Sequence, residues 1–219
     1  MNIKMLKGAF AGLVLSLSGF VNAGLITENF DDGLAQGWSL TGLWHVTGNN
    51  PNGSAGALGY VQGETTGTVL DGNFDVGGLA NSGTATSNIF HCQEAVVFGC
   101  TVTFDFLDSS ENYGFDQLDV YILHNGLETL ILENSDLNDD GQYRTMSYDI
   151  QALIGNSFDF KVMFKFDTID HIANNFSGPR IDNFIIVSDD ISSEVPEPST
   201  LAIFALGIMG LASRRFKKQ

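Results

Sequence analysis

The chain has 219 residues, of which 26 are acidic and only ten are lysine or arginine, for a formal net charge of −16. The acidic excess lies in the middle, because residues 24–195 hold 25 of the acids and four basic residues, a net charge of −21. Nucleic-acid binding needs the opposite sign and is excluded. A hydrophobic content of 43% with 17 phenylalanines also excludes an acidic disordered chain.

The first 23 residues are typical of a secretory signal peptide. Lys4 and Lys7 form its charged start, and the apolar stretch 8–20 follows. Small residues then predict cleavage between Ala23 and Gly24. An uncleaved membrane anchor is the alternative, but about 13 apolar residues are few for a hydrocarbon core of about 30 Å.

Residues 24–191 form one expected domain, long enough to bury roughly 70% of the surface of its unfolded chain. Apolar and polar residues alternate along it, which predicts strands rather than long amphipathic helices. The strands expected from this alternation are 101–106, 118–124, 127–132, 158–166 and 181–187. Asn125-Gly126 predicts a two-residue hairpin, and a single helical turn is expected at 150–154. Short strands between glycine-rich stretches predict an all-β antiparallel sandwich.

Several short motifs resemble secreted jelly-roll domains in their order along the chain. Residues 29–33 (Asn-Phe-Asp-Asp-Gly), Gly37-Trp38 and Gly42-Leu43-Trp44 resemble the first strand and turn of such domains. The later motifs lie at 119–126, 148–155, 164–168 and 181–184. Together they resemble concanavalin-like, MAM-type and carbohydrate-binding-module jelly rolls over residues 27–187, while residues 73–100 depart from the pattern. The resemblance implies an antiparallel jelly-roll β-sandwich.

The same resemblance implies a structural calcium ion that ties the first strand to the last. Its matching ligands are Asp31, the backbone carbonyl of Asn29, and Asp182. In the alternative interpretation, Asp31 belongs only to a turn and Asp182 is only a strand acid. Residues 136–141 also begin like a calcium loop, D-x-N-x-D-G, but Ser147 stands where that loop needs glutamate, so a solvated turn is expected there.

Cys92 and Cys100 are the only cysteines, eight positions apart in a chain predicted to be exported. We expect one disulfide between them, worth about 2–3 kcal/mol in the chain-entropy model. Two free thiols are the alternative. Zinc is disfavoured, because His91 is adjacent but a fourth ligand at matched spacing is missing.

Two tryptophans are candidates for stacking on sugar rings, whose apolar faces suit aromatic side chains. Trp38 is expected in the core, whereas Trp44 is a candidate ligand-binding residue. Tyr60, Tyr113 and Tyr121 are further candidates that no spacing supports.

Catalytic motifs are missing from the sequence. It contains no G-x-S-x-G, no H-E-x-x-H and no E-x-D-x-x-E string, and its four histidines are far apart. We therefore expect no enzymatic activity. A polysaccharide hydrolase remains the alternative, and it would need a cleft with a carboxylic acid of raised pKa.

The C-terminus carries the most specific motif. Val195-Pro196-Glu197-Pro198 closes a linker at 192–200, and an apolar segment at 201–212 and a basic tail up to residue 219 follow. An apolar segment followed by a basic tail is typical of a short membrane helix whose positive residues stay on the cytoplasmic side. The combination resembles the PEP-CTERM sorting signal of Gram-negative, exopolysaccharide-producing bacteria, which is recognised by a membrane-bound exosortase. A plain C-terminal anchor is the alternative.

These features together predict an exported, non-catalytic jelly-roll protein. The resemblance implies transient inner-membrane anchoring through residues 201–212, then delivery to the cell surface or extracellular matrix. We expect a role in adhesion or in organising an exopolysaccharide matrix, with polysaccharide and calcium as candidate ligands. A dedicated carbohydrate-binding module is the alternative and predicts exposed aromatic residues on one sheet or loop tip.

Overall fold

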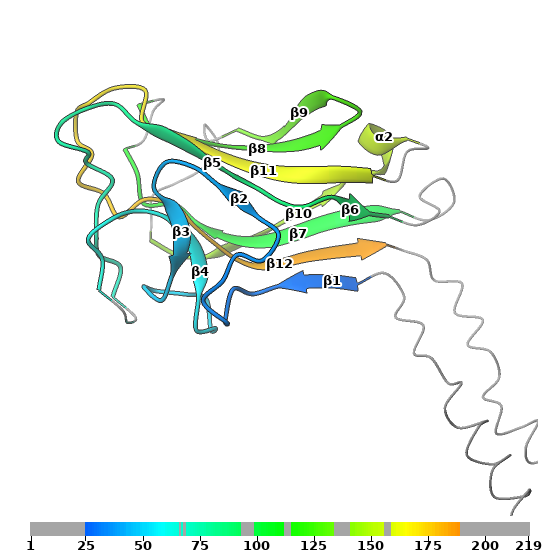
Figure 1. Ribbon diagram of the computed structural model, residues 1–219, viewed down its shortest axis with the longest axis horizontal. Coiled ribbons are helices and arrows are strands. Elements are labelled where there is room, and N and C mark those ends of the chain that lie inside the picture. The colour runs from blue at the N-terminus through cyan, green and yellow to red at the C-terminus, as the bar shows by residue number, and fades with distance from the viewer. Residues whose placement is uncertain are drawn as a thin grey trace, which may run out of the picture.

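The computed structural model describes residues 25–65, 67, 69–92, 99–111, 115–133, 141–155 and 159–188. Their strands form two antiparallel sheets that pack face to face (Figure 1). This arrangement is an antiparallel jelly-roll β-sandwich, which confirms the fold class expected from the sequence.

Sheet I has the strand order β10-β7-β12-β4-β3, and β1 also pairs with β12. Its strands are β1 (Leu25–Glu28), β3 (Trp44–Thr47), β4 (Ala57–Tyr60), β7 (Cys100–Leu107), β10 (Arg144–Asp149) and β12 (Arg180–Ser188). A register shift between Asp182 and Ile185 marks a β-bulge in β12.

Sheet II has the strand order β2-β5-β11-β8-β9, and β6 also pairs with β11. Its strands are β2 (Ser39–Leu40), β5 (Ser82–Thr86), β6 (Phe90–His91), β8 (Gln117–His124), β9 (Leu127–Leu132) and β11 (Asp159–Asp167). One short helix, α2 (Gln151–Ile154), follows β10 and is the helical turn expected there.

The strands with the clearest alternation form where the sequence predicts them. In β7, Val102, Phe104 and Phe106 are buried, and Thr103 and Asp105 between them are half-buried. The expected strand 127–132 is β9, and the others differ by one residue at one or both ends. Within residues 73–100, β5 and β6 were not predicted, because β5 consists of small and polar residues and β6 has only two residues, so neither shows a hydrophobic alternation.

Phe164 at the centre of β11 joins the two sheets through aromatic contacts. Its ring lies 5.1 Å from that of Phe104 on β7 and 5.9 Å from the stacked ring of Trp38 (centroid distances). Trp38 also meets Phe184 of β12 edge-to-face at 5.3 Å. Trp38 therefore packs against the core, as the sequence predicts. Each such pair adds about 0.5–1.5 kcal/mol to the burial of its rings.

The first and last described strands of the sandwich lie side by side. Leu25 at the start of β1 pairs with Val187 near the end of β12 (Figure 1). The strand pairings of the described residues and the disulfide all fall between residues 25 and 188, so a fragment spanning 24–191 contains both of these sheets and their common core. Such a fragment has what independent folding requires.

Candidate functional site

The hairpin between β8 and β9 builds one corner of sheet II. Asn125 and Gly126 both have positive φ, 51° and 77°, which is the type I′ turn that matches the twist of paired strands. Asparagine tolerates this conformation and glycine adopts it freely, so the sequence fixes the turn locally. The turn places His124 and Asn125 beside Asp159, the first residue of β11.

A pocket of about 290 Å³ opens at this corner. We call it the hairpin pocket; it is lined by Ile89, Leu123, His124, Asn125, Gly126, Asp159, Phe160 and Lys161. Phe160 is buried, Leu123 is half-buried and Ile89 is 61% exposed, so these three give the pocket an apolar part. The volume lies at the lower end of the range of about 300–1,000 Å³ that is usual for small-molecule sites.

The polar rim of the hairpin pocket is held by hydrogen bonds. Nδ1 of His124 donates to the backbone carbonyl of Asp159 at 2.8 Å, and the Asn125 amide donates to Nε2 of the same ring at 2.8 Å. A carbonyl only accepts and an amide nitrogen only donates, so these bonds fit an imidazole with its proton on Nδ1. The ring is thereby fixed in orientation at the rim.

Asp159 supplies a carboxylate to the same rim. Its Oδ1 lies 2.7 Å from Nδ1 of His91, and its side chain is 65% exposed. Lys161, two residues further along β11, faces the same side of the sheet. The pocket therefore combines an anion, a cation, an amide and an imidazole with apolar side chains in its lining.

The outer face of sheet II continues from the pocket along β8 and β11. Strand pairing sets Tyr121 beside Met163 and Asp119 beside Lys165, the next two rows beyond Leu123 and Lys161. The hydroxyl of Tyr121 donates to Oδ2 of Asp119 at 3.0 Å. Partial burial, followed by the nearby Asp119 carboxylate, raises the pKa of Tyr121 above its usual value. We call these two rows the sheet II strip.

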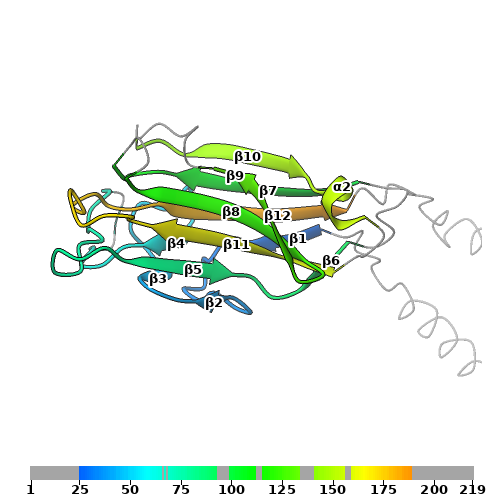
Figure 2. The same ribbon diagram turned by 90° about the horizontal axis from the view of Figure 1, so that it is seen from above.

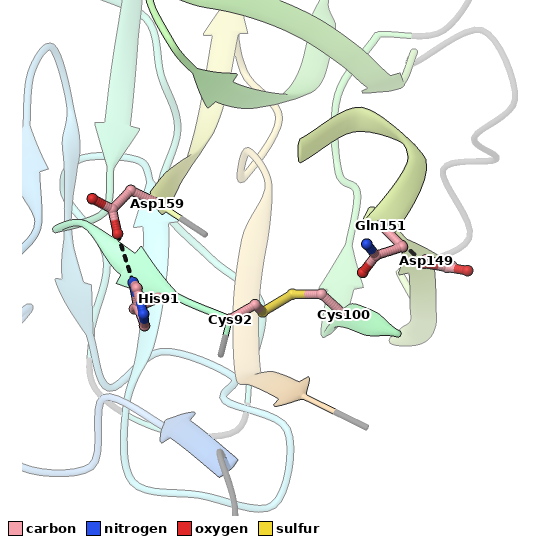
Figure 3. Close-up of a disulfide and its surroundings, with 6 residues drawn as sticks. All are labelled: His91, Cys92, Cys100, Asp149, Gln151 and Asp159. Carbon is pink, nitrogen blue, oxygen red and sulfur yellow. Dashed lines mark hydrogen bonds and ion pairs between the residues drawn. A yellow bond between two sulfur atoms is a disulfide. The ribbon is translucent and has the colours of Figure 1, made fainter. Parts of the chain in front are cut away.

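Cys92 and Cys100 form the disulfide expected from the sequence, with a Cα–Cα distance of 6.1 Å. It links the end of β6, which pairs with sheet II, to the start of β7 in sheet I. Figure 3 shows it between the His91–Asp159 pair and Asp149 and Gln151 at the start of α2. Cys100 pairs with Ser188 at the end of β12, and its disulfide partner Cys92 follows His91, which contacts the pocket residue Asp159. The hairpin pocket and the end of β12 therefore lie at the same end of the sandwich.

The proposed calcium ligands Asp31 and Asp182 both bind the loop 52–56. Oδ2 of Asp182 accepts from the backbone N–H of Asn52 at 2.8 Å and from the Ser54 hydroxyl at 2.7 Å. Oδ1 of Asp31 accepts from the backbone N–H of Ala55. The loop 52–56 thus contacts both the first turn and the last strand.

The contacts of these carboxylates are nevertheless those of hydrogen-bond acceptors. Asn29, whose backbone carbonyl is the third proposed ligand, donates from its side-chain amide to Asp31 at 2.5 Å. A calcium ion needs oxygen ligands whose lone pairs face it, whereas these carboxylates face N–H and O–H groups. Within the described residues, no group of three or more His, Cys, Asp or Glu side chains could hold a metal ion. Calcium at Asp31 and Asp182 stays a prediction.

The aromatic residues expected as sugar platforms are mostly buried. Trp44 is 4% exposed and its ring packs edge-to-face on Tyr60 at 5.6 Å, because β3 turns this side chain into the core. Its expected ligand-binding role is therefore wrong, and Tyr60, which is fully buried, is excluded as well. Tyr121 lies on the outer face of sheet II. Tyr113 and most of the loop 136–141 lie outside the described residues.

A polysaccharide hydrolase would need a cleft with a carboxylic acid of raised pKa. Asp116 has a pKa raised to about 7, mainly by burial, with the charges of Glu111, Asp108 and Asp170 adding to the effect. Its side chain is fully buried, and it is not among the residues lining the hairpin pocket. The raised pKa of Asp116 is therefore not that of an acid presented to a substrate.

Nothing in the sequence indicates the hairpin pocket. The Asn125-Gly126 turn is predicted, but neither this turn nor the four separate histidines points to a binding role. Asp159 and Phe160 reach the turn only because β11 pairs with β8, about 40 residues earlier in the chain. The one local signal is the turn itself, because a type I′ turn determines which residues flank it at the end of the two paired strands.

Residues 194–218 match the PEP-CTERM protein-sorting motif. This match confirms the C-terminal resemblance, and it includes the motif Val195–Pro198. The motif indicates a protein exported in Gram-negative bacteria along a cell-surface route and processed by an exosortase. No curated protein sequence matches the chain at a significant level.

The solved structures similar to this chain are mainly carbohydrate-binding modules and lectins. TmCBM61 in complex with β-1,4-galactotriose has a TM-score of 0.48 at 11% identity, over 73% of this chain and 94% of that one. The CBM22-1 xylan-binding domain of Paenibacillus barcinonensis Xyn10C has a TM-score of 0.44 at 11% identity, over 76% and 95%. Lectin II from Ulex europaeus has a TM-score of 0.43 at 10% identity, over 75% and 98%.

Among the described residues, no helix is long and apolar enough to cross a membrane. The apolar segment 201–212 and the cleavage position Ala23–Gly24 lie outside these residues. Membrane anchoring and signal cleavage therefore stay predictions, as do the boundaries 1–23, 24–191, 192–200 and 201–219.

Proposed function

We propose that this exported protein is a non-catalytic carbohydrate-binding protein of the cell surface or extracellular matrix, and that its sandwich holds a saccharide in the hairpin pocket. The observation that carries this proposal is the composition of the pocket. Carboxylate, ammonium, amide and imidazole groups line it together with the apolar side chains of Phe160, Leu123 and Ile89.

Sugar rings match such a pocket because they are amphipathic. Their C–H faces pack on apolar side chains, and their hydroxyl groups both donate and accept hydrogen bonds. A hydroxyl that bridges Asp159 and Lys161 would donate to the first and accept from the second. Hydrogen bonds to charged groups contribute about 1.5–3 kcal/mol each, so two such bonds can select one arrangement of hydroxyls.

The sheet II strip supports binding of further sugar units beside the pocket. Tyr121 places a half-buried aromatic side chain on this face, and Asp119 and Lys165 again pair an acceptor with a donor. The rows follow each other at two-residue steps along the strands, about 6.6 Å apart. A polysaccharide chain that leaves the pocket in this direction would meet polar groups at each step.

The route to the cell surface supports a polysaccharide ligand. The PEP-CTERM motif at 194–218 places the protein on an exosortase-dependent path. We propose that residues 201–212 anchor the protein in the inner membrane before processing. The released or surface-held sandwich would then contact secreted polysaccharide, which fits a role in organising the matrix.

The test is a calorimetric titration of the fragment 24–191 with a panel of mono- and oligosaccharides and with the exopolysaccharide of the producing strain. We expect binding of at least one of them, and Asp159→Asn should weaken it at least ten-fold. The matched control is Asp167→Asn, because Asp167 ends the same strand on the same face but lies outside the pocket. Equal affinities of these two variants, or no binding by the wild type, would contradict the proposal.

A second candidate function is cross-linking of the matrix through divalent cations. It is favoured by the net charge of −21 over residues 24–195, because dense carboxylates bind and share such ions. This function predicts reversible, calcium-dependent association with acidic polysaccharide that Asp159→Asn leaves unchanged. Turbidity of the mixture with and without EDTA measures it.

A further inference from the structure

The chain contains two Asn-Gly pairs, Asn52-Gly53 and Asn125-Gly126. Asparagine in this dipeptide is labile, because the backbone nitrogen of the glycine can attack the side-chain amide carbon with no Cβ in its way. The reaction needs an accessible amide, a glycine N–H outside any hydrogen bond, and a backbone that can rotate. The two pairs of this protein differ in all three respects.

Hydrogen bonds hold the pair Asn52-Gly53 in place. The Asn52 side-chain amide donates to Oδ2 of Asp105 at 2.8 Å, and its backbone N–H donates to Oδ2 of Asp182 at 2.8 Å. The N–H of Gly53, which would be the attacking group, donates to the carbonyl of Pro51 at 3.1 Å. Hydrogen bonds to charged groups contribute about 1.5–3 kcal/mol each, so the fold protects this pair.

The pair Asn125-Gly126 at the tip of the β8–β9 hairpin has much weaker support. Both of its residues are exposed. Within the described part of the chain, the Asn125 side chain makes one hydrogen bond, to Nε2 of the neutral His124 ring at 2.8 Å. The N–H of Gly126 makes none with the described residues, as expected for the centre of a two-residue turn. Both reacting groups are therefore accessible.

The backbone of this turn also has room to rotate. β9 pairs with β8 and with no other described strand, and Leu127 and Glu128 at its start are exposed. The space where a Cβ of residue 126 would stand contains no atom within 4 Å, the chain neighbours aside. Figure 2 shows the tip of the hairpin at the end of the sandwich that also carries β6.

The attack requires the turn to leave its type I′ conformation for a short time. Exposed segments with few packing contacts open at a low free-energy cost. The hairpin tip meets this condition, whereas opening the loop 52–56 would break its hydrogen bonds to Asp105 and Asp182. The same dipeptide is thus reactive at one end of the sandwich and protected in the loop 52–56.

We propose that Asn125 is a site of spontaneous deamidation in the folded protein, and that Asn52 is not. The backbone nitrogen of Gly126 forms a bond to Cγ of Asn125 and loses its proton to water. The Cγ–Nδ2 bond breaks, and the nitrogen takes up a proton and leaves as ammonia. Water then opens the resulting succinimide ring, at Cγ to give aspartate or at the backbone carbonyl to give isoaspartate. One water is consumed and one ammonia is released, with no change of oxidation state.

Deamidation changes the rim of the hairpin pocket. A carboxylate at position 125 cannot donate to Nε2 of His124, so the ring loses one of the two hydrogen bonds that fix it. It also adds a negative charge to a lining that already contains Asp159. Isoaspartate further inserts one carbon atom into the main chain of a turn whose type depends on its two-residue length.

A consequence for ligand binding follows, and it rests on the proposed function. If the hairpin pocket holds a saccharide, the deamidated protein should bind it at least ten-fold more weakly than the intact protein. The protein would then lose its ligand with age while its sandwich stays folded, because the turn lies at the surface and outside the core.

Peptide mapping by mass spectrometry tests the modification itself. The fragment 24–191 is incubated at pH 8 and at pH 5, and the aspartate and isoaspartate forms of each Asn-Gly peptide are measured over time. We expect both forms to accumulate at position 125, faster at pH 8 because the attacking nitrogen must lose its proton. Asn52 in the same sample is the matched control and should stay intact.

Urea provides the reference rate for this experiment. In the unfolded fragment the hydrogen bonds of Asn52 are lost, so the two pairs should react at similar rates. In the folded fragment we expect Asn125 to react at least ten-fold faster than Asn52. Equal rates in the folded fragment, or an Asn125 that stays intact while both pairs react in urea, would overturn the proposal.

The variant Asn125→Asp tests the consequence for the pocket separately. Asp-Gly also suits a type I′ turn, so this variant should fold like the wild type. Calorimetric titration with the saccharide that the wild type binds should show the ten-fold loss, and equal affinities would overturn the consequence for the pocket. Failure of the wild type to bind any saccharide would contradict the proposed function alone, because the peptide map does not depend on a ligand.

Discussion

The Ser54 hydroxyl lies 2.7 Å from Oδ2 of Asp182 and donates to it, which joins the loop 52–56 to the last strand of the sandwich. Asp182 is fully buried and pairs across the strands with Asp105, whose Oδ2 accepts from the Asn52 amide at 2.8 Å. Burial, and to a lesser extent the Asp105 charge, raises the pKa of Asp182 above its usual range. The hydrogen bonds from Asn52 and Ser54 offset part of the free-energy cost of burying this carboxylate.

Removing the Ser54 hydroxyl should destabilise the sandwich. Ser54→Ala leaves a buried carboxylate oxygen with one donor fewer, for which we expect a loss of about 1–3 kcal/mol in the free energy of unfolding. The loss should be larger at pH 8 than at pH 4, because only the ionised form of Asp182 needs the donor. Urea denaturation measures both values. Ser39→Ala, at an exposed position of β2, is the control and should change stability little.

Calcium binding at Asp31 and Asp182 would require the ion to displace these donors. If the ion predicted from the sequence is present, millimolar calcium should raise the thermal midpoint of the fragment 24–191 and magnesium should not. The gain is about 2.7 kcal/mol at a hundred-fold excess over Kd. Asp31→Asn should abolish it. Identical midpoints in EDTA and in calcium would show that the prediction is wrong and that hydrogen bonds alone close this end of the sandwich.

The stability of the fold should fall as the pH rises toward 8. Asp116 has a pKa raised to about 7 in the folded protein, mainly by burial, from a usual value of 3.8. Between these two values the unfolded chain releases this proton and the folded chain keeps it, so each pH unit costs up to about 1.4 kcal/mol. Guanidinium denaturation from pH 4 to pH 8 measures the slope.

Two variants separate Asp116 from the general effect of the acidic charge. Asp116→Asn keeps the shape of the side chain and should flatten the pH dependence. Glu133→Gln removes an exposed acid after β9 and should leave the slope unchanged. A slope that survives Asp116→Asn would assign the pH dependence to other groups.

Reduction of the Cys92–Cys100 disulfide should cost about 2–3 kcal/mol of unfolding free energy, because the bridge limits the unfolded chain. The double variant Cys92→Ala/Cys100→Ala should lose a similar amount. Reductant should then have no further effect on it, which controls for other actions of the reagent. Denaturation curves of the wild type that coincide with and without reductant would contradict this expectation.

The local features of this fold could be predicted because neighbouring residues carry them. The type I′ turn at Asn125-Gly126 depends on two adjacent backbone conformations, and the alternation in β7 follows from the two-residue period of a strand. The disulfide joins cysteines only eight positions apart. The hairpin pocket could not be predicted in this way, because Ile89, Leu123 and Asp159 come from separate segments.

By itself, the sequence determined the sandwich class, the hairpin, the disulfide and the sorting motif at 194–218, since each depends on local pattern or on a linear signal. Tertiary packing alone decided that Trp44 is buried and that Asp31 and Asp182 both bind the loop 52–56. Trp44 has an equally amphipathic ring in either environment, so only the strands packed around it fix its exposure. Likewise, a carboxylate becomes a hydrogen-bond anchor or a metal ligand according to which groups the fold brings to face it.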